Sequence, residues 1–320
     1  INYGLKERIV NPDLSIRYNW DRIYNQRFSI RWRRALVDYD DNEPIWPLAA
    51  TFLNLYDKKN YRKLYRLQEL VLSYSREIGR GIYLDVNSSW SARSSVANKT
   101  NYSFSKKGEI YPENFPLELP LQLLPKEEQV ISSIDIRWRP GLKYWKFPDR
   151  RIPMGSKYPI FRVRYDLAVP VTDGGAEWQK IMLSIRKSSI RIANIGYISS
   201  VANVQFFLSD NNVLWPDLFH FNGNEIMWLS GNKYMRGFMN MPYYQYSTAA
   251  ANYTFFTEHH FDGYILDKVP LIKKLGWKSI LGYSRMQQEG GFNWNEAFFG
   301  IENIGLGPYR GGRINFVGSW

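Results

Sequence analysis

The sequence predicts an all-β fold, an antiparallel transmembrane β-barrel of about 12 to 14 strands. Three observations predict it: hydrophobic residues recur with a period of two, their polar partners are rich in Arg and Asp, and 320 residues include 12 Trp, 23 Tyr and 18 Phe. Tyr and Trp gather where water meets an apolar phase. No window offers the ~18 to 20 uninterrupted apolar residues of a spanning helix, so a membrane location would require strands.

The alternating runs follow one another along the whole chain. In the first run, Leu14, Ile16 and Tyr18 alternate with Ser15 and Arg17. Successive residues of a strand point to opposite faces, so each run has one apolar and one polar face. The runs lie, in chain order, at 14–20, 28–33, 70–74, 82–87, 134–139, 161–169 and 181–186, and further runs lie near 190–198, 201–208, 243–258, 277–286, 296–304 and 312–320. At roughly 23 residues per strand and connection, the length gives about 14 strands, and an even count is typical of single-chain bacterial barrels.

One stretch, 44–65, departs from this period. Its apolar residues Leu48, Phe52, Leu55 and Tyr56 have helix-like spacing, so we expect a short helical or lid insertion there. No repeat of 20–50 residues stands out, which argues against propellers and solenoids. No linker divides the chain, and we expect residues 1–320 to form a single barrel domain.

Charged residues occupy the polar positions of the runs, so they are expected to lie on one face of the sheet. A closed barrel turns its apolar face to lipid and its polar face to the lumen, where Arg and Asp can pair. The predicted lumen-facing charges are Arg17, Arg31, Arg33, Asp85, Asp135, Arg137, Arg139, Arg162, Arg164, Asp166 and Arg186. They would either give an anion-selective lumen or form Arg–Asp ladders that close it. We favour the ladders, because narrow barrels are often filled by side chains or a plug.

Several Trp residues lie near the ends of the runs, where the aromatic girdles of a membrane barrel are found. The predicted interface aromatics are Trp20, Trp32, Trp90, Trp138, Trp178 and Trp277. A second aromatic group lies between runs, and it would either bind a partner or pack within its own loop. This possible partner loop contains Trp215, Phe219 and Phe221.

The net charge is +12 and the pI is about 9.6. A basic protein favours phosphate-bearing partners such as anionic lipid and lipopolysaccharide. The basic residues alternate with apolar ones instead of forming a continuous tract, so we expect no nucleic acid. A soluble, aromatic-rich β-sandwich that binds carbohydrate would show the same alternation and is kept as an alternative.

The sequence offers little for catalysis. It has no Cys and three His, which excludes disulfides, thiolate metal sites and cysteine nucleophiles. Glu258 and His260 share a strand face and could pair, whereas His259 faces the other side, and a hydrogen bond at the strand end is the favoured interpretation. Asp217 and His220 have no positioned nucleophile nearby, so structural hydrogen bonds are expected. We expect neither a cofactor nor a metal, and no enzymatic activity.

Several segments have distinctive residue orders, and the most specific is EHHFDGYILDKVPLIKKL. They lie at 60–86, 156–165, 213–225, 246–284 and 299–304. In these segments the chain resembles a family of Bacteroidota outer-membrane proteins, in which an N-terminal carboxypeptidase-regulatory-like domain precedes a long domain of unknown function, and the resemblance covers most of the chain after about residue 10. The resemblance implies an outer-membrane barrel, with the signal, the regulatory-like domain and one further C-terminal strand absent from this chain. It carries over no catalytic residues.

From these observations we expect an integral outer-membrane barrel that acts as a structural or accessory subunit of an envelope complex, in protein assembly or surface export. Its partners would be outer-membrane lipids, including lipopolysaccharide, and other outer-membrane or periplasmic proteins. A passive or anion-selective pore, and the soluble carbohydrate-binding sandwich, are the alternatives.

Overall fold

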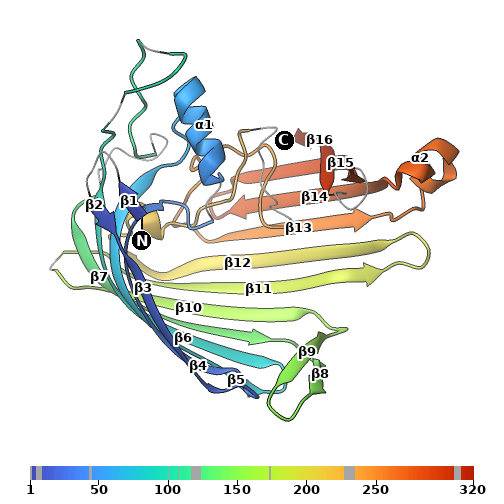
Figure 1. The fold of residues 1–320 in the computed structure, drawn as a ribbon, viewed down its shortest axis with the longest axis horizontal. Coiled ribbons are helices and arrows are strands. Elements are labelled where there is room, and N and C mark those ends of the chain that lie inside the picture. Colours follow the sequence, from blue (N-terminus) through green and yellow to red (C-terminus); the bar gives the residue numbers. More distant parts are fainter. Residues whose placement is uncertain are drawn as a thin grey trace.

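The computed structural model describes residues 2–4, 9–42, 45–99, 101–106, 108–116, 124–172, 174–226, 235–305 and 311–320. Its centre is one strongly curved antiparallel sheet of twelve strands (Figure 1). Neighbours in the sheet are neighbours in the chain, except that a small hairpin, β8–β9, is inserted between β7 and β10. The predicted all-β antiparallel fold is confirmed, with the strand count at the lower end of the expected range.

The twelve strands run through the chain as follows. They are β3 (Asp13–Asp21), β4 (Gln26–Asp38), β5 (Leu64–Gly79), β6 (Ile82–Ser95), β7 (Glu127–Trp138), β10 (Ile160–Pro170), β11 (Glu177–Arg191), β12 (Tyr197–Asn211), β13 (Asn252–His260), β14 (Lys278–Gln288), β15 (Asn293–Ile304) and β16 (Gly312–Ser319). Two small hairpins stand apart from the sheet: β1 (Asn2–Gly4) with β2 (Ile9–Asn11), and β8 (Lys143–Lys146) with β9 (Arg151–Gly155).

Short helices lie in the connections. They are α1 (Pro47–Asp57), α2 (Pro270–Leu275) and the 3-10 turns η1 (Trp215–Asp217) and η2 (Leu266–Lys268). Helix α1 confirms the helical insertion expected within 44–65, of which residue 44 lies outside the described residues. It begins with Pro47 and ends where Lys58 adopts a left-handed backbone conformation, with φ 49°. Neither α1 nor α2 combines the length and the apolar character needed to cross a membrane, and this holds for the described residues alone.

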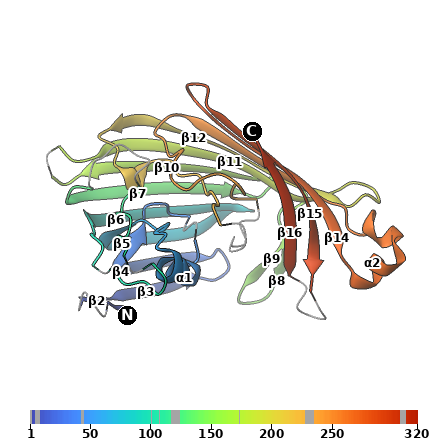
Figure 2. The same cartoon turned by 90° about the horizontal axis from the view of Figure 1, so that it is seen from above.

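In the part of the chain that the structure describes, the sheet is not closed into a barrel, so closure remains a prediction. Within the described residues, the pairing runs from β16 to β3 without joining these two edge strands. Figure 2 shows the edges on opposite sides of an opening. Alternation fixes which face a side chain occupies, but it is the same in an open and a closed sheet, so the sequence pattern does not reveal closure.

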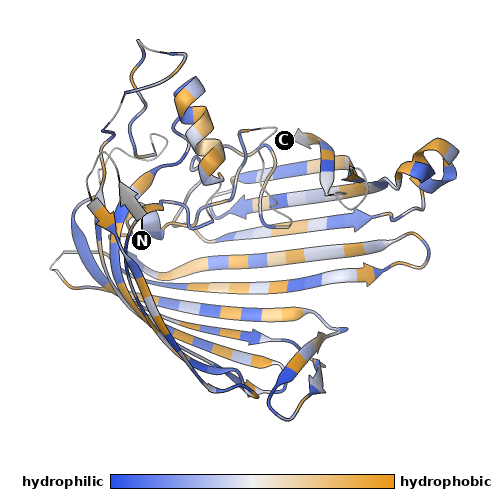
Figure 3. Cartoon of the chain, in the orientation of Figure 1, coloured by the Kyte–Doolittle hydropathy of each residue, from blue (hydrophilic) through white to orange (hydrophobic). Residues whose placement is uncertain are grey.

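The two faces of the sheet differ in chemistry, as the alternating colours along each strand in Figure 3 show. We call outer the face that carries Ile30, Leu72 and Ile134, all substantially exposed. The inner face carries the opposite parity, including Phe256 and Met286, which pack against Phe221, Phe238 and Met241 of the connection between β12 and β13. The hydrophobic core therefore lies between the inner face and inserted chain.

Candidate functional site

The predicted lumen charges lie together on the inner face. The pairing register places ten of the eleven on the same side of β3, β4, β6, β7, β10 and β11, and Arg139 follows the end of β7. Five of the arginines bind carboxylates there. The pairs are Arg31 with Asp13, Arg33 with Glu69, Arg137 with Asp85, Arg162 with Asp135, and Arg164 with Asp166. These ladders neutralise much of the positive charge of the set.

The best-buried ion pairs among the described residues join Asp217, for which structural hydrogen bonds were expected, to Arg93, which was not predicted. Arg93, on the inner face of β6, donates Nη1–H and Nη2–H to the two carboxylate oxygens of Asp217, each at 2.8 Å. Its Nη2 also lies 2.9 Å from Glu127 Oε2 of β7, and Glu127 in turn accepts the backbone N–H of Ala176 at 2.8 Å. All three side chains are buried. Asp217 lies in the β12–β13 connection, so this cluster anchors that connection to the sheet.

We call residues 213–226 and 235–251 the inserted segment, since this part of the β12–β13 connection packs on the inner face. Its second anchor is Glu296, which is fully buried on β15. The carboxylate accepts the backbone N–H groups of Met239 at 2.6 Å and Asn240 at 2.8 Å. Trp294 Nε1 donates to the same carboxylate at 2.9 Å. Three donors thus satisfy a charge that would otherwise be costly to bury.

A third anchor lies at the end of β4. Tyr244 of the inserted segment donates its hydroxyl to Asp38 Oδ1 at 2.6 Å, and Arg62 Nε lies 3.2 Å from Asp38 Oδ2. Burial raises the pKa of Asp38 to about 6, although Tyr244, the backbone N–H of Asp40 and Arg62 oppose the shift. Burial also raises the pKa of Tyr244 well above its usual value, so this hydroxyl remains a donor.

The predicted partner loop packs inward. Phe219 and Phe221 are only 4% and 6% exposed, and Phe219 lies 4.7 Å from the Phe207 ring of β12. Trp215 is half-buried against Tyr39. For Phe219 and Phe221 the burial favours the second of the two alternatives, packing of the loop, because aromatic side chains gain by burial.

The histidines make structural contacts. His220 binds Ser247 Oγ and Trp215 O, each at 2.8 Å. His260 Nδ1 lies 2.9 Å from Glu302 Oε1, and its Nε2 lies 3.4 Å from Glu258 Oε2, so the predicted Glu258–His260 pair forms. In the described part of the chain, no three His, Asp or Glu side chains are arranged as a metal site.

The predicted interface tryptophans divide into two groups. On the outer face, Trp32 and Trp90 lie at the same level of the sheet, because both pair with Leu70 of β5. Trp90 is level with the start of β7, whereas Trp138 lies at the other end of that strand. Trp20 lies exposed near the end of β3 and Trp277 directly precedes β14, partly buried.

Trp178 is the exception and corrects the prediction. It is 1% exposed on the inner face, where Lys180 Nζ lies 4.5 Å from its ring centroid. Along β11, Trp178 alternates in step with Lys180 and Met182 and out of step with the outward Ile181. The alternation of the sequence therefore already indicated that Trp178 faces inward.

The sequence matches one known protein family. Residues 1–301 match the model of a family of unknown function (DUF5686), C-terminal domain. The chain belongs to this family. No curated protein matches the chain. The DUF5686 match agrees with the resemblance as far as the domain of unknown function, whereas the bacterial group, the outer membrane and the N-terminal domain remain predictions.

Proposed function

We propose that this DUF5686 domain forms the wall of an integral outer-membrane β-barrel. Its own inserted segment packs on the inner face, and it serves as a non-catalytic structural or accessory subunit of an envelope complex. The observation that carries the proposal is the outer face, an exposed apolar surface with tryptophans near its ends. Exposure of such a surface to water is unfavourable and promotes aggregation, whereas contact with lipid is favourable.

The height of this band supports a membrane. Trp90 of β6 pairs with Val130 of β7, and Trp138 lies eight residues further along β7. At ~3.3 Å per residue this separation is about 26 Å along the strand. Apolar bands of outer-membrane barrels are about 25 Å tall, and strand tilt shortens the projected height somewhat. Between the two tryptophans, the outer positions of β7 include Ile134 and Ile136.

The inserted segment on the inner face favours an accessory role over a passive pore. The inserted segment is attached to the inner face through Asp217, the amides that bind Glu296, and Tyr244. The arginine ladders bind carboxylates and leave little of the one-sided field that an anion-selective pore would need. We therefore expect no steady current when the protein is placed in a planar bilayer.

The proposal also concerns the two edge strands of the sheet, β3 and β16. In lipid an unpaired strand edge is not tolerated, because its N–H and C=O groups have no water to bind. Ile16 of β3 is 76% exposed and Phe316 of β16 is 70% exposed, so both edges carry outward apolar residues. We propose that β3 and β16 are paired in the membrane, which suits a wall that is completed by further strands of the complex.

A pair of arginine substitutions tests the membrane location. Leu72 and Ser73 are adjacent on β5, but Leu72 faces outward and Ser73 faces inward. In a membrane, Leu72→Arg should destabilise the protein by about 2–4 kcal/mol, because a cation enters the apolar band. Ser73→Arg is the matched control and should change the unfolding free energy much less. An effect of Leu72→Arg within about 0.5 kcal/mol, typical of a water-exposed site, would show that this face is not lipid-facing.

The accessory role needs its own test. Purification of the full-length protein from native membranes in mild detergent should bring down other envelope proteins in fixed stoichiometry. A clean monomer under these conditions would contradict the role as a subunit, but would leave the membrane location untouched.

A further inference from the structure

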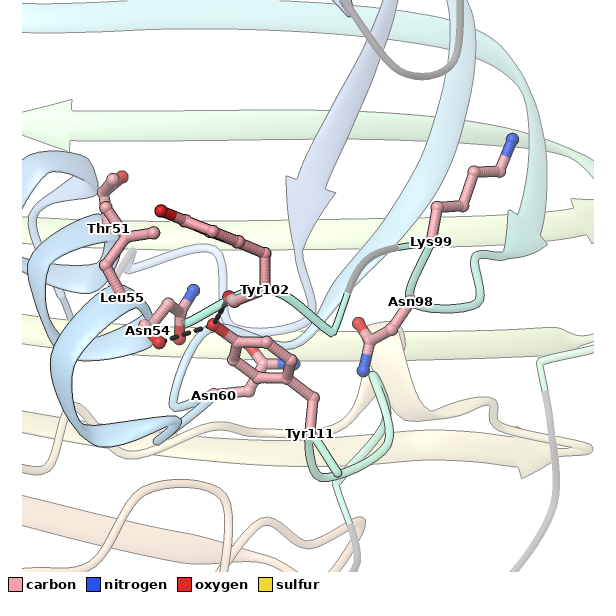
Figure 4. A pocket seen from close by; sticks show the side chains of 8 residues that line it. All are labelled: Thr51, Asn54, Leu55, Asn60, Asn98, Lys99, Tyr102 and Tyr111. Carbon is pink, nitrogen blue, oxygen red and sulfur yellow. Dashed lines mark hydrogen bonds between the residues drawn. The ribbon is translucent and has the colours of Figure 1, made fainter. Parts of the chain in front are cut away.

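A cavity lies away from the sheet, between α1 and the chain that follows β6. Its volume is about 570 Å³, within the range of small-molecule sites. Figure 4 shows the side chains around it. They are Thr51, Asn54, Leu55, Asn60, Asn98, Lys99, Tyr102 and Tyr111.

Hydrogen bonds fix the two walls of the cavity to each other. The Tyr111 hydroxyl lies 2.5 Å from Asn54 O of α1 and 2.8 Å from Tyr102 O, as the dashed lines in Figure 4 show. Ser103 Oγ donates to Leu55 O at 2.7 Å, and the backbone N–H of Phe104 donates to the same oxygen at 2.8 Å. The site is therefore held in place before any ligand arrives, which favours affinity.

The polar lining is mostly uncharged and suits a polyhydroxylated ligand. Three asparagine amides and the hydroxyls of Thr51 and two tyrosines line it, and Thr51, Asn98 and Tyr111 already donate to backbone carbonyls while their side-chain oxygens remain acceptors. Among the lining residues that the structure describes there is no carboxylate and no histidine, and Lys99 is the one charged side chain. Sugar hydroxyls likewise both donate and accept, and Lys99 suits a sugar that carries a carboxylate or a phosphate.

Asn54 provides a second, independent observation. Its side-chain oxygen Oδ1 is buried and has no hydrogen-bond partner. An unsatisfied buried acceptor destabilises a protein, so native structures usually pair it. Because this oxygen has no solvent-accessible surface, a ligand hydroxyl would pair with it only after the Asn54 side chain turns toward the cavity.

A row of neighbouring aromatic rings extends from the cavity. The Tyr102 ring lies 5.4 Å from Phe104, Phe104 lies 5.4 Å from Tyr56, and Tyr56 lies 4.5 Å from Phe52. All four rings are exposed, Tyr102 at 58%. Phe52 and Tyr56 are one helical turn apart, so the row of rings continues along the exposed face of α1. Ring faces stack on the apolar C–H surfaces of pyranose units, and contiguous exposed aromatics mark binding surfaces.

We infer that the cavity binds an oligosaccharide, with one sugar unit among the asparagines and the next units along the rings of Tyr102, Phe104 and Tyr56. The site lies outside the apolar band, so this inference does not depend on the proposed barrel function.

The experiment is isothermal titration of the full chain in detergent with three probes. They are maltohexaose, chitohexaose and the deacylated core oligosaccharide of lipopolysaccharide, which differ in acetamido and phosphate groups. At least one should bind, and Tyr102→Ala should weaken that binding by about tenfold or more, because truncation removes the stacking ring beside the cavity. Tyr158→Ala is the matched control, since Tyr158 is also highly exposed but lies in the β9–β10 connection, away from the cavity.

A second variant tests the buried acceptor. Asn54→Leu should also weaken binding, while the thermal unfolding midpoint reports whether α1 is intact. Binding of the charged core alone would support the inference and assign a role to Lys99. Failure of all three probes to bind, or equal binding by wild type and Tyr102→Ala, would overturn it.

Discussion

Arg93 and Asp217 form a bidentate, buried ion pair between residues 124 positions apart in the chain. Both N–H···O distances are 2.8 Å, and both side chains are almost fully buried. The pair joins β6 of the sheet to the inserted segment. Because a planar guanidinium matches a carboxylate at two points, it fixes orientation as well as distance.

Breaking this pair should loosen the inserted segment. Arg93→Ala leaves Asp217 and Glu127 buried without their cation, and we expect a loss of about 3–5 kcal/mol in unfolding free energy. Hydrogen exchange of residues 213–226 should become faster, as measured by mass spectrometry. The control is Arg137→Ala, whose 3.5 Å pair with Asp85 is more exposed and should contribute below about 1 kcal/mol. Equal effects of the two variants would mean that Arg93 does not act as an anchor.

Gly282 should be sensitive to a single methyl group. A Cβ atom there would lie 2.0 Å from Phe298 Cζ on the neighbouring strand β15, and Phe298 is itself buried beneath the Arg313 guanidinium. We expect Gly282→Ala to destabilise the sheet by about 1–3 kcal/mol through overpacking. Gly318→Ala on β16, where a Cβ meets nothing within 4 Å, should have little effect. Chemical unfolding followed by Trp fluorescence measures both, and similar midpoints would argue against this packing.

The raised pKa of Asp38 predicts a pH dependence of stability. Asp38 lies six residues beyond Trp32, outside the apolar band, and burial raises its pKa to about 6. The folded state therefore holds this proton more tightly than the unfolded state, whose pKa is about 3.9. The stabilisation is complete below about pH 4 and is lost as the pH rises to about 6, a change of about 3 kcal/mol.

The measurement compares wild type with Asp38→Asn across this range. The difference in unfolding free energy between them should change between about pH 4 and pH 6, with wild type losing stability relative to the variant as pH rises. Above about pH 7 the difference should be constant. A flat difference over the whole range would show that Asp38 does not titrate in this way.

Edge pairing in the membrane can be read from hydrogen exchange. In the isolated chain in detergent, peptides from the edge strand β3 should exchange faster than peptides from the internal strand β5, because half of the β3 amides have no strand partner. In the full-length protein in native membranes, β3 should become as protected as β5. Fast exchange of β3 in both preparations would contradict the proposed completion of the wall.

Much of the wall could be predicted from the sequence, because a period of two decides the face of every strand residue. The grouping of Arg31, Asp85 and Arg164 on one face followed from parity alone. Trp178 was misplaced because its position near the end of a run was given more weight than its parity. The alternation rule, applied strictly, would have placed it inside.

The interior could not be predicted in the same way. Arg93 lies beyond the alternating run at 82–87 and Asp217 in an irregular connection, and no local pattern relates residues so far apart in the chain. Whether the sheet closes also depends on long-range geometry. Local periodicity therefore determines the two faces, and only the folded chain shows what fills the inner one.

The order of the strands has a consequence for how the molecule assembles. Each strand of the sheet pairs with its predecessor, apart from the β8–β9 excursion, so the wall can form hairpin by hairpin with short loop closures. The inserted segment, however, precedes three of its partners, Phe256, Met286 and Glu296, along the chain. It can bind Arg93 and Asp38 of earlier strands first, but its contacts with Phe256, Met286 and Glu296 require β13 to β15, so its packing on the inner face is completed only after these strands have formed.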